Sequence, residues 1–334
     1  MFDFFEKIAT GIGFKLIDNF TDKVAEWIKG IFKECEEGDS GYNAQNASSG
    51  DNAQNASSGY NAQNASSGDY AQNASSGYNA QNASSGDYAK NASSGYNAKN
   101  ASSGDYAQNA SSGDNAQNVI SGKNSICFDC GYHGIIKAVK GTWISLAEYG
   151  KNEEDKIVPI YAKSAQIGNK EYKDHSGKIL KSTVFYTLWK KEFYEVDEFD
   201  GIKTIKISEK KRDGITIIKA VDMSTLLDDE IKEIYIAKEG KLLAHGYTVR
   251  EAVEDLTFKK MKDVNVDEIV AKIKEAGKVT RSQYRAITGA CSFGTNRFCE
   301  QHNIQDLEEI ELTELRKILI DDYGAKKFWE LIGE

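Results

Sequence analysis

The sequence contains few of the residues that restrict the backbone or cross-link the chain, namely proline and cysteine. Among its 334 residues there is one proline, Pro159, and there are five cysteines. An odd and small number of cysteines argues against a disulfide framework and indicates a reducing compartment. The sequence also lacks an apolar run of membrane-spanning length and a secretory signal pattern. We therefore expect a cytoplasmic protein.

An excess of basic charge is also absent. The chain holds 42 Lys and Arg against 51 Asp and Glu, which gives a net charge of −9 at pH 7. Because basic residues that neutralise phosphates dominate nucleic-acid affinity, this balance disfavours a general nucleic-acid coat. We find no Ser-His-Asp order, no phosphate-binding loop and no pair of carboxylates at a metal-binding spacing. The sequence therefore predicts a protein that is not an enzyme and that uses no cofactor.

What the sequence has in abundance is repetition. From Gly41 to Asn118 it repeats a nine-residue unit of the form GYNAQNASS or GDNAQNASS. The residue after each glycine alternates between tyrosine and aspartate, so the true repeat is two units, or eighteen residues. Fixed-period self-similarity is the signature of a solenoid. The alternating residues are Tyr42, Asp51, Tyr60, Asp69, Tyr78, Asp87, Tyr96 and Asp105.

The small residues of the repeat keep strict register, which favours a β-solenoid over residues 39–142 rather than a disordered linker. Ala44 and Ala47 recur in successive units, and a thin two-sided coil would have room for nothing larger in its core. Glycine at each corner would supply a turn with positive φ, and Asn46 with its equivalents could form a ladder of side-chain amides. We expect coils about 4.8 Å apart, with the tyrosines in one column and the aspartates in another.

Both columns are candidate contacts for a protein partner, and the aspartates raise a particular question. Like charges about 5 Å apart repel by roughly 0.8 kcal/mol per pair in water, and salt lowers this value. Asp51, Asp69, Asp87 and Asp105 could therefore be present because they bind a basic surface. They could equally keep a solenoid with exposed strand edges soluble and prevent its end-to-end association. The sequence leaves both alternatives open.

Residues 1–38 precede the repeat and carry an apolar stripe with the spacing of an amphipathic helix. This helix could cap the first coil, pair with a second copy of itself in a homo-oligomer, or lie on a membrane surface. Membrane-surface helices are usually rich in basic residues, whereas this segment ends in Glu34, Glu36 and Glu37, which disfavours the membrane. The stripe consists of Phe5, Ile8, Ile12, Leu16, Phe20, Val24, Ile28 and Phe32.

After residue 118 the repeat gives way to strand-like sequence with larger apolar residues. The repeat running into Asn-Ser-Ile at 124–126, and then Lys-Gly-Thr-Trp-Ile-Ser-Leu-Ala-Glu-Tyr at 140–149, resembles a family of repeat proteins encoded by phages and prophages. Segments 185–196 and 244–252 resemble the same family, and the strands that begin with Asn-Ser are similar to the β-roll heads of trimeric adhesins. The resemblance covers residues 41–260 and implies a β-solenoid. Because most members of that family have no known function, it implies little about activity.

Cys127, Cys130 and His133 form the motif that looks most like a metal site. A CxxC pair followed by histidine could begin a zinc site. A structural zinc site needs four ligands, no second CxxC is present, and Cys291 and Cys299 lie far along the chain. The alternative is that the two cysteines are small apolar residues that fill the core. We favour this alternative and predict no metal ion.

The rest of the chain predicts two further domains. Residues 143–262 alternate as antiparallel strands do and end in a helix that begins with a capping box, Thr248 to Glu251. His245, just before this helix, is interpreted as a turn or packing residue. Residues 263–334 have the periodicity of short amphipathic helices. The predicted fold class is thus mixed β and α: a repeat β-solenoid, an antiparallel β-rich domain and a helical domain.

The helical domain contains a possible helix-turn-helix. Thr280 and Thr295 are plausible N-caps of two helices that a glycine-containing turn separates. In a helix-turn-helix the second helix would read base edges, and its candidate readers are Asn296, Arg297 and Gln301. From residue 267 onward the chain has ten basic and thirteen acidic residues, a net of −3, which disfavours DNA binding.

The sequence favours a protein-binding protein of phage or prophage origin that is not an enzyme. By resemblance and context it would inhibit a host defence system, in the manner of an anti-CRISPR protein, by binding a host defence complex in the host cytoplasm. The main alternative is a structural spacer or an adhesin-like part of a virion or cell surface, which a rigid rod would also suit. A DNA-binding regulator is a further alternative.

Overall fold

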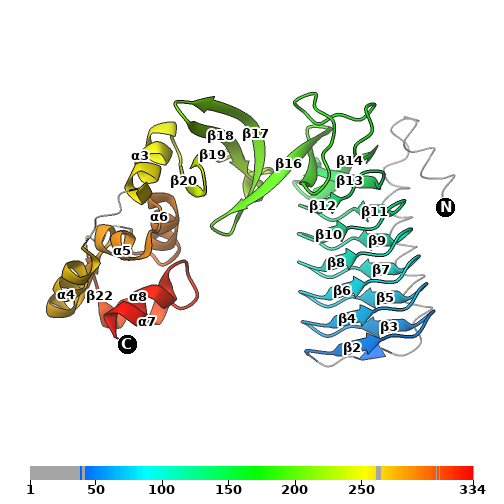
Figure 1. The fold of residues 1–334 in the computed structure, drawn as a ribbon, viewed down its shortest axis with the longest axis horizontal. Coiled ribbons are helices and arrows are strands. Elements are labelled where there is room, and N and C mark those ends of the chain that lie inside the picture. Colours follow the sequence, from blue (N-terminus) through cyan, green and yellow to red (C-terminus); the bar gives the residue numbers. More distant parts are fainter. Residues whose placement is uncertain (1–37, 40–41, 261–264, 306, 308, 334) are drawn as a thin grey trace. The chain divides into compact units, whose positions relative to one another are not determined.

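The computed structural model describes residues 38–39, 42–260, 265–305, 307 and 309–333 (Figure 1). Apart from its last residue, the predicted helix over residues 1–38 lies outside this part of the chain. The chain divides into two compact units, Met1–Asp197 and Glu198–Glu334. The boundary falls within the segment 143–262, because some strands of that segment pack on the solenoid and others pack against the helices.

The first unit is built on a β-solenoid, as predicted. Each coil of eighteen residues contributes two four-residue strands, one to each of two parallel sheets, and Asn64 pairs with Asn82 eighteen positions away. Figure 1 shows these strands as two columns of stacked arrows. One column consists of β2 (Gln45–Ser48), β4 (Gln63–Ser66), β6 (Gln81–Ser84), β8 (Lys99–Ser102), β10 (Gln117–Ile120) and β12 (Ile135–Ala138). The other consists of β1 (Gly38–Asp39), β3 (Gln54–Ser57), β5 (Gln72–Ser75), β7 (Lys90–Ser93), β9 (Gln108–Ser111) and β11 (Ile126–Asp129).

The core of each coil holds alanine and asparagine in place of large apolar side chains. Ala62 and Ala80 are fully buried. Nδ2 of Asn64 donates to Oδ1 of Asn82 over 3.0 Å, and the same bond recurs from coil to coil. Nδ2 of Asn64 also donates to the carbonyl of Ala74 on the opposite sheet, over 2.7 Å. The predicted amide ladder is therefore present, and it joins the two sheets across the thin core.

The corner glycines are required for a reason that differs from the prediction. In the described part of the repeat, no glycine adopts a positive φ. The left-handed conformation occurs instead at the second residue after the corner glycine, as at Asn52 and Tyr70. A Cβ atom on Gly77 would lie 1.7 Å from the carbonyl oxygen of Gly59 in the preceding coil. The expectation that glycine supplies the left-handed turn is thus wrong. Glycine is needed because adjacent coils approach too closely for any side chain.

Larger apolar side chains close the C-terminal end of the solenoid. Ile136, Ile144, Tyr186 and Phe193 belong to one buried cluster there. Around this cluster the strands are antiparallel: the hairpin of β13 and β14 continues one sheet, and β15 and β16 follow β12 in the other. These strands cover an end that would otherwise expose unpaired backbone groups. Their bounds are β13 (Trp143–Lys151), β14 (Ile157–Gln166), β15 (Phe185–Trp189) and β16 (Glu192–Phe199).

The second unit combines an antiparallel meander with short helices. Strands β17 (Ile202–Arg212), β18 (Ile215–Asp222), β19 (Glu233–Glu239) and β20 (Leu242–Gly246) pair in chain order, with a 3-10 turn at Met223–Thr225. A short pair, β21 (Lys278–Thr280) and β22 (Glu309–Glu311), lies among the helices. The helices are α3 (Val249–Lys260), α4 (Val266–Ala276), α5 (Arg281–Thr288), α6 (Ser292–Gln301), α7 (Leu312–Ile318) and α8 (Ala325–Ile332).

Thr248 and Thr280 begin helices as predicted, whereas Thr295 does not. The backbone N–H of Glu251 donates to Oγ1 of Thr248 over 3.1 Å at the start of α3, and Thr280 opens α5 with a capping box. Thr295 lies inside α6, whose N-cap is Cys291. Cysteine is not among the residues that usually cap helices, so the sequence pattern pointed to the nearest threonine instead. In the described part of the chain, no helix is long and apolar enough to cross a membrane.

Candidate functional site

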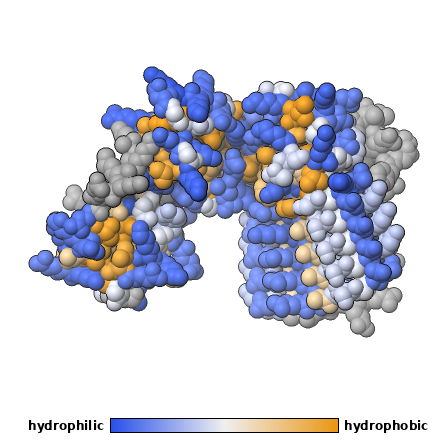
Figure 2. All heavy atoms as spheres, in the orientation of Figure 1, coloured by the Kyte–Doolittle hydropathy of each residue, from blue (hydrophilic) through white to orange (hydrophobic). Residues whose placement is uncertain are grey.

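One corner of the solenoid carries the predicted tyrosine column. The rings of Tyr42, Tyr60, Tyr78 and Tyr96 stack with centroids 4.8–5.1 Å apart. The side chains remain accessible, with exposures between 40% and 65%. In Figure 2 the coil stack carries straight stripes of like hydropathy, because each residue lies over its equivalent eighteen positions away. The repeat thus produces a continuous aromatic ladder on the surface.

The other corner carries a second ladder that the sequence analysis missed. Tyr70, Tyr88 and Tyr106 stack with centroids 4.9 Å apart, and each follows an aspartate of the predicted column. The signal was present, since these units read GDY where others read GDN. All three tyrosines have φ between 57° and 59°. This left-handed conformation suits asparagine but is uncommon for a bulky residue, so tyrosine is placed there against the local backbone preference.

The aspartates of this corner have a structural role that the sequence did not show. Oδ1 of Asp51 accepts the backbone N–H of Asp69 over 3.0 Å, and the same bond links Asp69 to Asp87 and Asp87 to Asp105. Each side chain therefore supports the turn of the next coil. An asparagine Oδ1 could accept the same bond, so the bond alone does not explain why these residues are charged.

Desolvation and stacking raise the pKa of one tyrosine hydroxyl in each ladder. The pKa of Tyr88 is raised above its ordinary value of 10.0, by desolvation first and then by Tyr70, Tyr106 and Asp87. The pKa of Tyr78 is raised by desolvation and by its two stacked neighbours. Tyr78 and Tyr88 therefore keep neutral hydroxyl groups at neutral pH, and the aspartate side chains lie beside the second ladder.

The CxxC motif does not form a cluster of metal ligands in the structure. Cys127 belongs to the buried cluster at the solenoid end, whereas Cys130 packs in a separate cluster with alanines of β3, β5, β7 and β9. Sγ of Cys130 donates to the carbonyl of Ser111 over 3.3 Å, and His133 stacks on Tyr132. The two cysteines thus occupy core positions, and burial raises the pKa of each thiol.

The candidate nucleic-acid readers lie on α6. Asn296 and Gln301 are exposed and Arg297 is half-buried. Arg297 and Gln301 line a pocket of about 240 Å³, together with Phe298 and Tyr323. Side chains that line a pocket in the protein are less available to base edges, so the structure adds nothing in favour of DNA binding.

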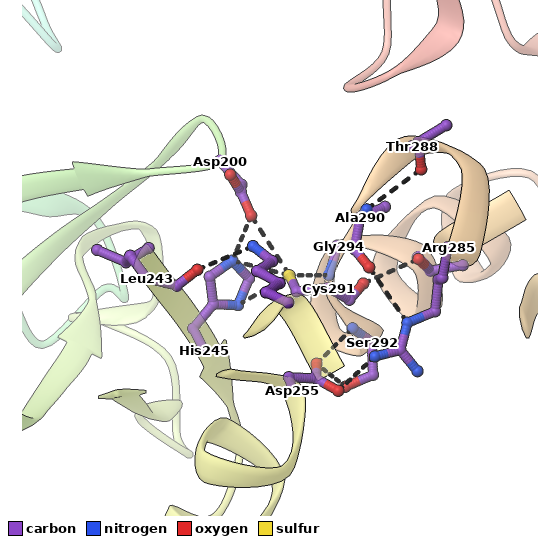
Figure 3. Close-up of polar contacts among 12 residues, drawn as sticks. Asp200, Leu243, His245, Asp255, Arg285, Thr288, Ala290, Cys291, Ser292 and Gly294 are labelled. Carbon is purple, nitrogen blue, oxygen red and sulfur yellow. Dashed lines mark hydrogen bonds and ion pairs between the residues drawn. The ribbon is translucent and has the colours of Figure 1, made fainter. Parts of the chain in front are cut away.

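The second unit also contains a cluster that the sequence analysis did not anticipate. His245 Nε2 lies 2.7 Å from Oδ2 of Asp200 and 3.2 Å from Sγ of Cys291. Cys291 Sγ lies 3.3 Å from the same Asp200 oxygen (Figure 3). Both the His245 and the Cys291 side chains are 1% exposed, and that of Asp200 is 22% exposed. These residues are at least 45 positions apart in the sequence, so no local motif could reveal the cluster.

No family model, curated protein or solved structure matches this chain.

A second set of polar contacts holds the cluster in place. Asp255 on α3 accepts hydrogen bonds from the backbone N–H of Ser292 over 2.6 Å and from Arg285 (Figure 3). The Ser292 hydroxyl donates to the same carboxylate. These bonds fasten α3 to the start of α6, where Cys291 is the N-cap, and so fix the position of the thiol relative to His245.

The cluster is not arranged as a catalytic triad. In a triad the acid binds the histidine nitrogen remote from the nucleophile, whereas Asp200 and Cys291 both approach Nε2 of His245. Desolvation first, and then the Asp200 carboxylate, raises the pKa of Cys291 to about 12, so the thiol is protonated at neutral pH. The arrangement therefore lacks the activated thiolate that nucleophilic catalysis needs.

Proposed function

We propose that the chain is a non-enzymatic protein-binding protein whose solenoid corners form the binding surface. The observation that carries the proposal is the pair of accessible tyrosine ladders. Tyrosine contributes a large, amphipathic contact area with few rotatable bonds, and it is enriched where proteins bind one another. A ladder held by a hydrogen-bonded solenoid is already ordered, so little conformational entropy is lost on binding.

Two details favour a binding role over a purely structural one. Tyr70, Tyr88 and Tyr106 adopt left-handed backbone conformations in which asparagine would be less strained. The residues before them are aspartates, although an uncharged asparagine could make the same hydrogen bond. Both choices oppose local stability and both shape the same exposed corner, as expected if that corner binds a partner with basic side chains.

The finer form of the proposal is that the partner is a host defence complex and the chain is a phage or prophage inhibitor of it. This form rests on the sequence resemblance. Capture of proteins from host lysate on the purified chain, followed by mass spectrometry, distinguishes it from the alternative. A host nuclease complex would support inhibition, whereas virion proteins or glycans would support a structural spacer or an adhesin-like role. A homo-oligomer formed through residues 1–38 stays a prediction, because those residues lie outside the described structure.

Replacing all four aspartates of the column by asparagine is expected to weaken partner binding by roughly fourfold or more. Exposed ion pairs contribute about 0.2–1 kcal/mol each, and four are removed together. The salt dependence of the affinity should also flatten, because fewer charge pairs are left for salt to screen. Titration calorimetry with the captured partner at two salt concentrations measures both effects. The substitutions are Asp51→Asn, Asp69→Asn, Asp87→Asn and Asp105→Asn.

The matched control removes the same charge from the second unit, at Asp213, Asp228, Asp229 and Glu230, which are exposed there. Asparagine replaces each of the three aspartates and glutamine replaces Glu230, and the affinity for the partner should be unchanged. If the column variant binds as tightly as the wild type and loses only solubility, the column is a solvated edge and the proposal for it fails.

A further inference from the structure

We infer that Asp200, His245 and Cys291 form a binding site for a zinc ion. The three donor atoms, Oδ2, Nε2 and Sγ, lie 2.7, 3.2 and 3.3 Å from one another and form a closed triangle. Figure 3 shows the three side chains pointing toward a common centre from different elements of the second unit. The inference is independent of the proposed binding role of the solenoid.

The fold supplies these donors from rigid positions. His245 belongs to β20, and Cys291 is the N-cap of α6. Asp200 lies in the turn before β17, where it and Gly201 have φ values of 47° and 80°. Aspartate tolerates this left-handed conformation better than most residues, and here it directs the carboxylate toward the histidine. Because each donor comes from a separate element, the triangle is set by the tertiary structure.

The donor set has the chemistry that zinc prefers. Thiolate, imidazole and carboxylate are its usual protein ligands, with bonds of about 2.0–2.3 Å in tetrahedral geometry. Two ligand atoms around such an ion lie roughly 3.3–3.6 Å apart. The two sides of the triangle at Cys291 are already close to this separation, and the His245–Asp200 side, at 2.7 Å, would need to lengthen by about 0.6 Å. An ion would also replace the protons that otherwise separate three electronegative atoms at these distances.

The surroundings of the triangle suit a bound ion. The backbone N–H of Gly294 points at Sγ of Cys291 over 3.3 Å, and such a bond stabilises a thiolate ligand. Lys259 lies close enough to lower the pKa of Asp200, and its Nζ donates to the carbonyl of Leu243 over 2.9 Å. A doubly charged zinc ion with one thiolate and one carboxylate is neutral overall, so Lys259 would not face a net positive charge.

Space for a fourth ligand exists on one side of the triangle. Asp200 and Cys291 line the pocket of about 240 Å³, whose other walls include Tyr284 and Phe298. Three protein ligands with an open fourth position are typical of zinc sites that bind water or a further ligand, whereas closed structural sites have four protein ligands. The site therefore fits an ion that is accessible from the pocket.

Metal titration of the full-length chain tests the inference. The protein is stripped with a chelator and dialysed, and then titrated with Zn²⁺ or with Co²⁺ as a spectroscopic probe. We expect one ion per chain, visible Co²⁺ bands of tetrahedral intensity and a thiolate-to-metal charge-transfer band. The variants Cys291→Ser and His245→Gln should bind Zn²⁺ at least roughly 100-fold more weakly, because even the loss of a ligand's hydrogen-bonding partner weakens binding 10- to 100-fold.

The controls separate this site from other thiols and from misfolding. Serine is a good helix N-cap, so Cys291→Ser should retain α6, which circular dichroism checks. Cys299→Ser changes another buried cysteine of the same helix and should bind Zn²⁺ like the wild type, as should Cys127→Ser in the solenoid. The inference is overturned if the wild type binds no Zn²⁺, if Cys291→Ser binds it equally well, or if Cys127→Ser abolishes the charge-transfer band.

Discussion

Gly77→Ala is expected to destabilise the solenoid by about 3 kcal/mol or more, which is the upper end of the range for overpacked sites. The added Cβ would lie 1.7 Å from the carbonyl oxygen of Gly59 and 2.7 Å from its carbonyl carbon. Those atoms belong to the backbone of the adjacent coil, so they cannot move aside as the end of a flexible side chain could. Guanidinium unfolding followed by circular dichroism measures the loss.

Gly50→Ala is the matched control for this prediction. Gly50 has the same place in the nine-residue unit as Gly77, but it lies at the other corner, in the first described coil, and among the described residues nothing lies within 4 Å of its added Cβ. Its substitution should change the free energy of unfolding by less than about 0.5 kcal/mol, as surface changes usually do. Equal stability of the Gly77→Ala and Gly50→Ala proteins would contradict the close coil-to-coil approach that the structure shows.

The second large effect is expected from the buried amide ladder. Asn82 accepts a hydrogen bond from Asn64 and donates to Asn100 and to the carbonyl of Ala92, over 2.7–3.0 Å. Asn82→Ala would leave these buried groups without their partner. Each unsatisfied buried polar group costs about 1–3 kcal/mol, so we expect a loss of at least about 3 kcal/mol in the same unfolding experiment.

An exposed asparagine ladder provides the comparison. Asn61 donates to Oδ1 of Asn43 over 3.1 Å on the surface of the solenoid, where water can replace the bond. Asn61→Ala should therefore cost less than about 1 kcal/mol. If Asn61→Ala and Asn82→Ala destabilise the protein equally, the buried ladder is not what holds the two sheets together.

The solenoid could be predicted because its periodicity is written directly in the sequence. The alternation of Tyr42 and Asp51 required an eighteen-residue coil, and the invariant small residues required a thin core. What could not be predicted were contacts between coils. The distance between Gly77 and Gly59 and the bond from Asp69 to Asp51 depend on the exact stacking of successive turns.

The cluster in the second unit escaped prediction for a different reason. Asp200, His245 and Cys291 are brought together by the packing of a turn, a strand and a helix N-terminus, and no sequence spacing encodes that packing. From the sequence alone His245 is interpreted as a turn or packing residue, which is the usual role of an isolated histidine. By contrast, Cys127 and Cys130 have a conspicuous spacing, yet each lies in a different part of the solenoid core.

Site-specific photocrosslinking tests the central claim most directly. A benzophenone amino acid replaces Tyr78 in one ladder, Tyr88 in the other, or Gln63, which is exposed on a sheet face, and each protein is irradiated in cell lysate. We predict that a probe at position 78 or 88 forms a discrete adduct with one protein, and that an excess of unlabelled wild-type chain abolishes this adduct. A probe at position 63 should form no adduct. The absence of an adduct at both ladder positions, together with one from a probe at Asn296 on α6, would contradict the account and place the binding surface in the second unit.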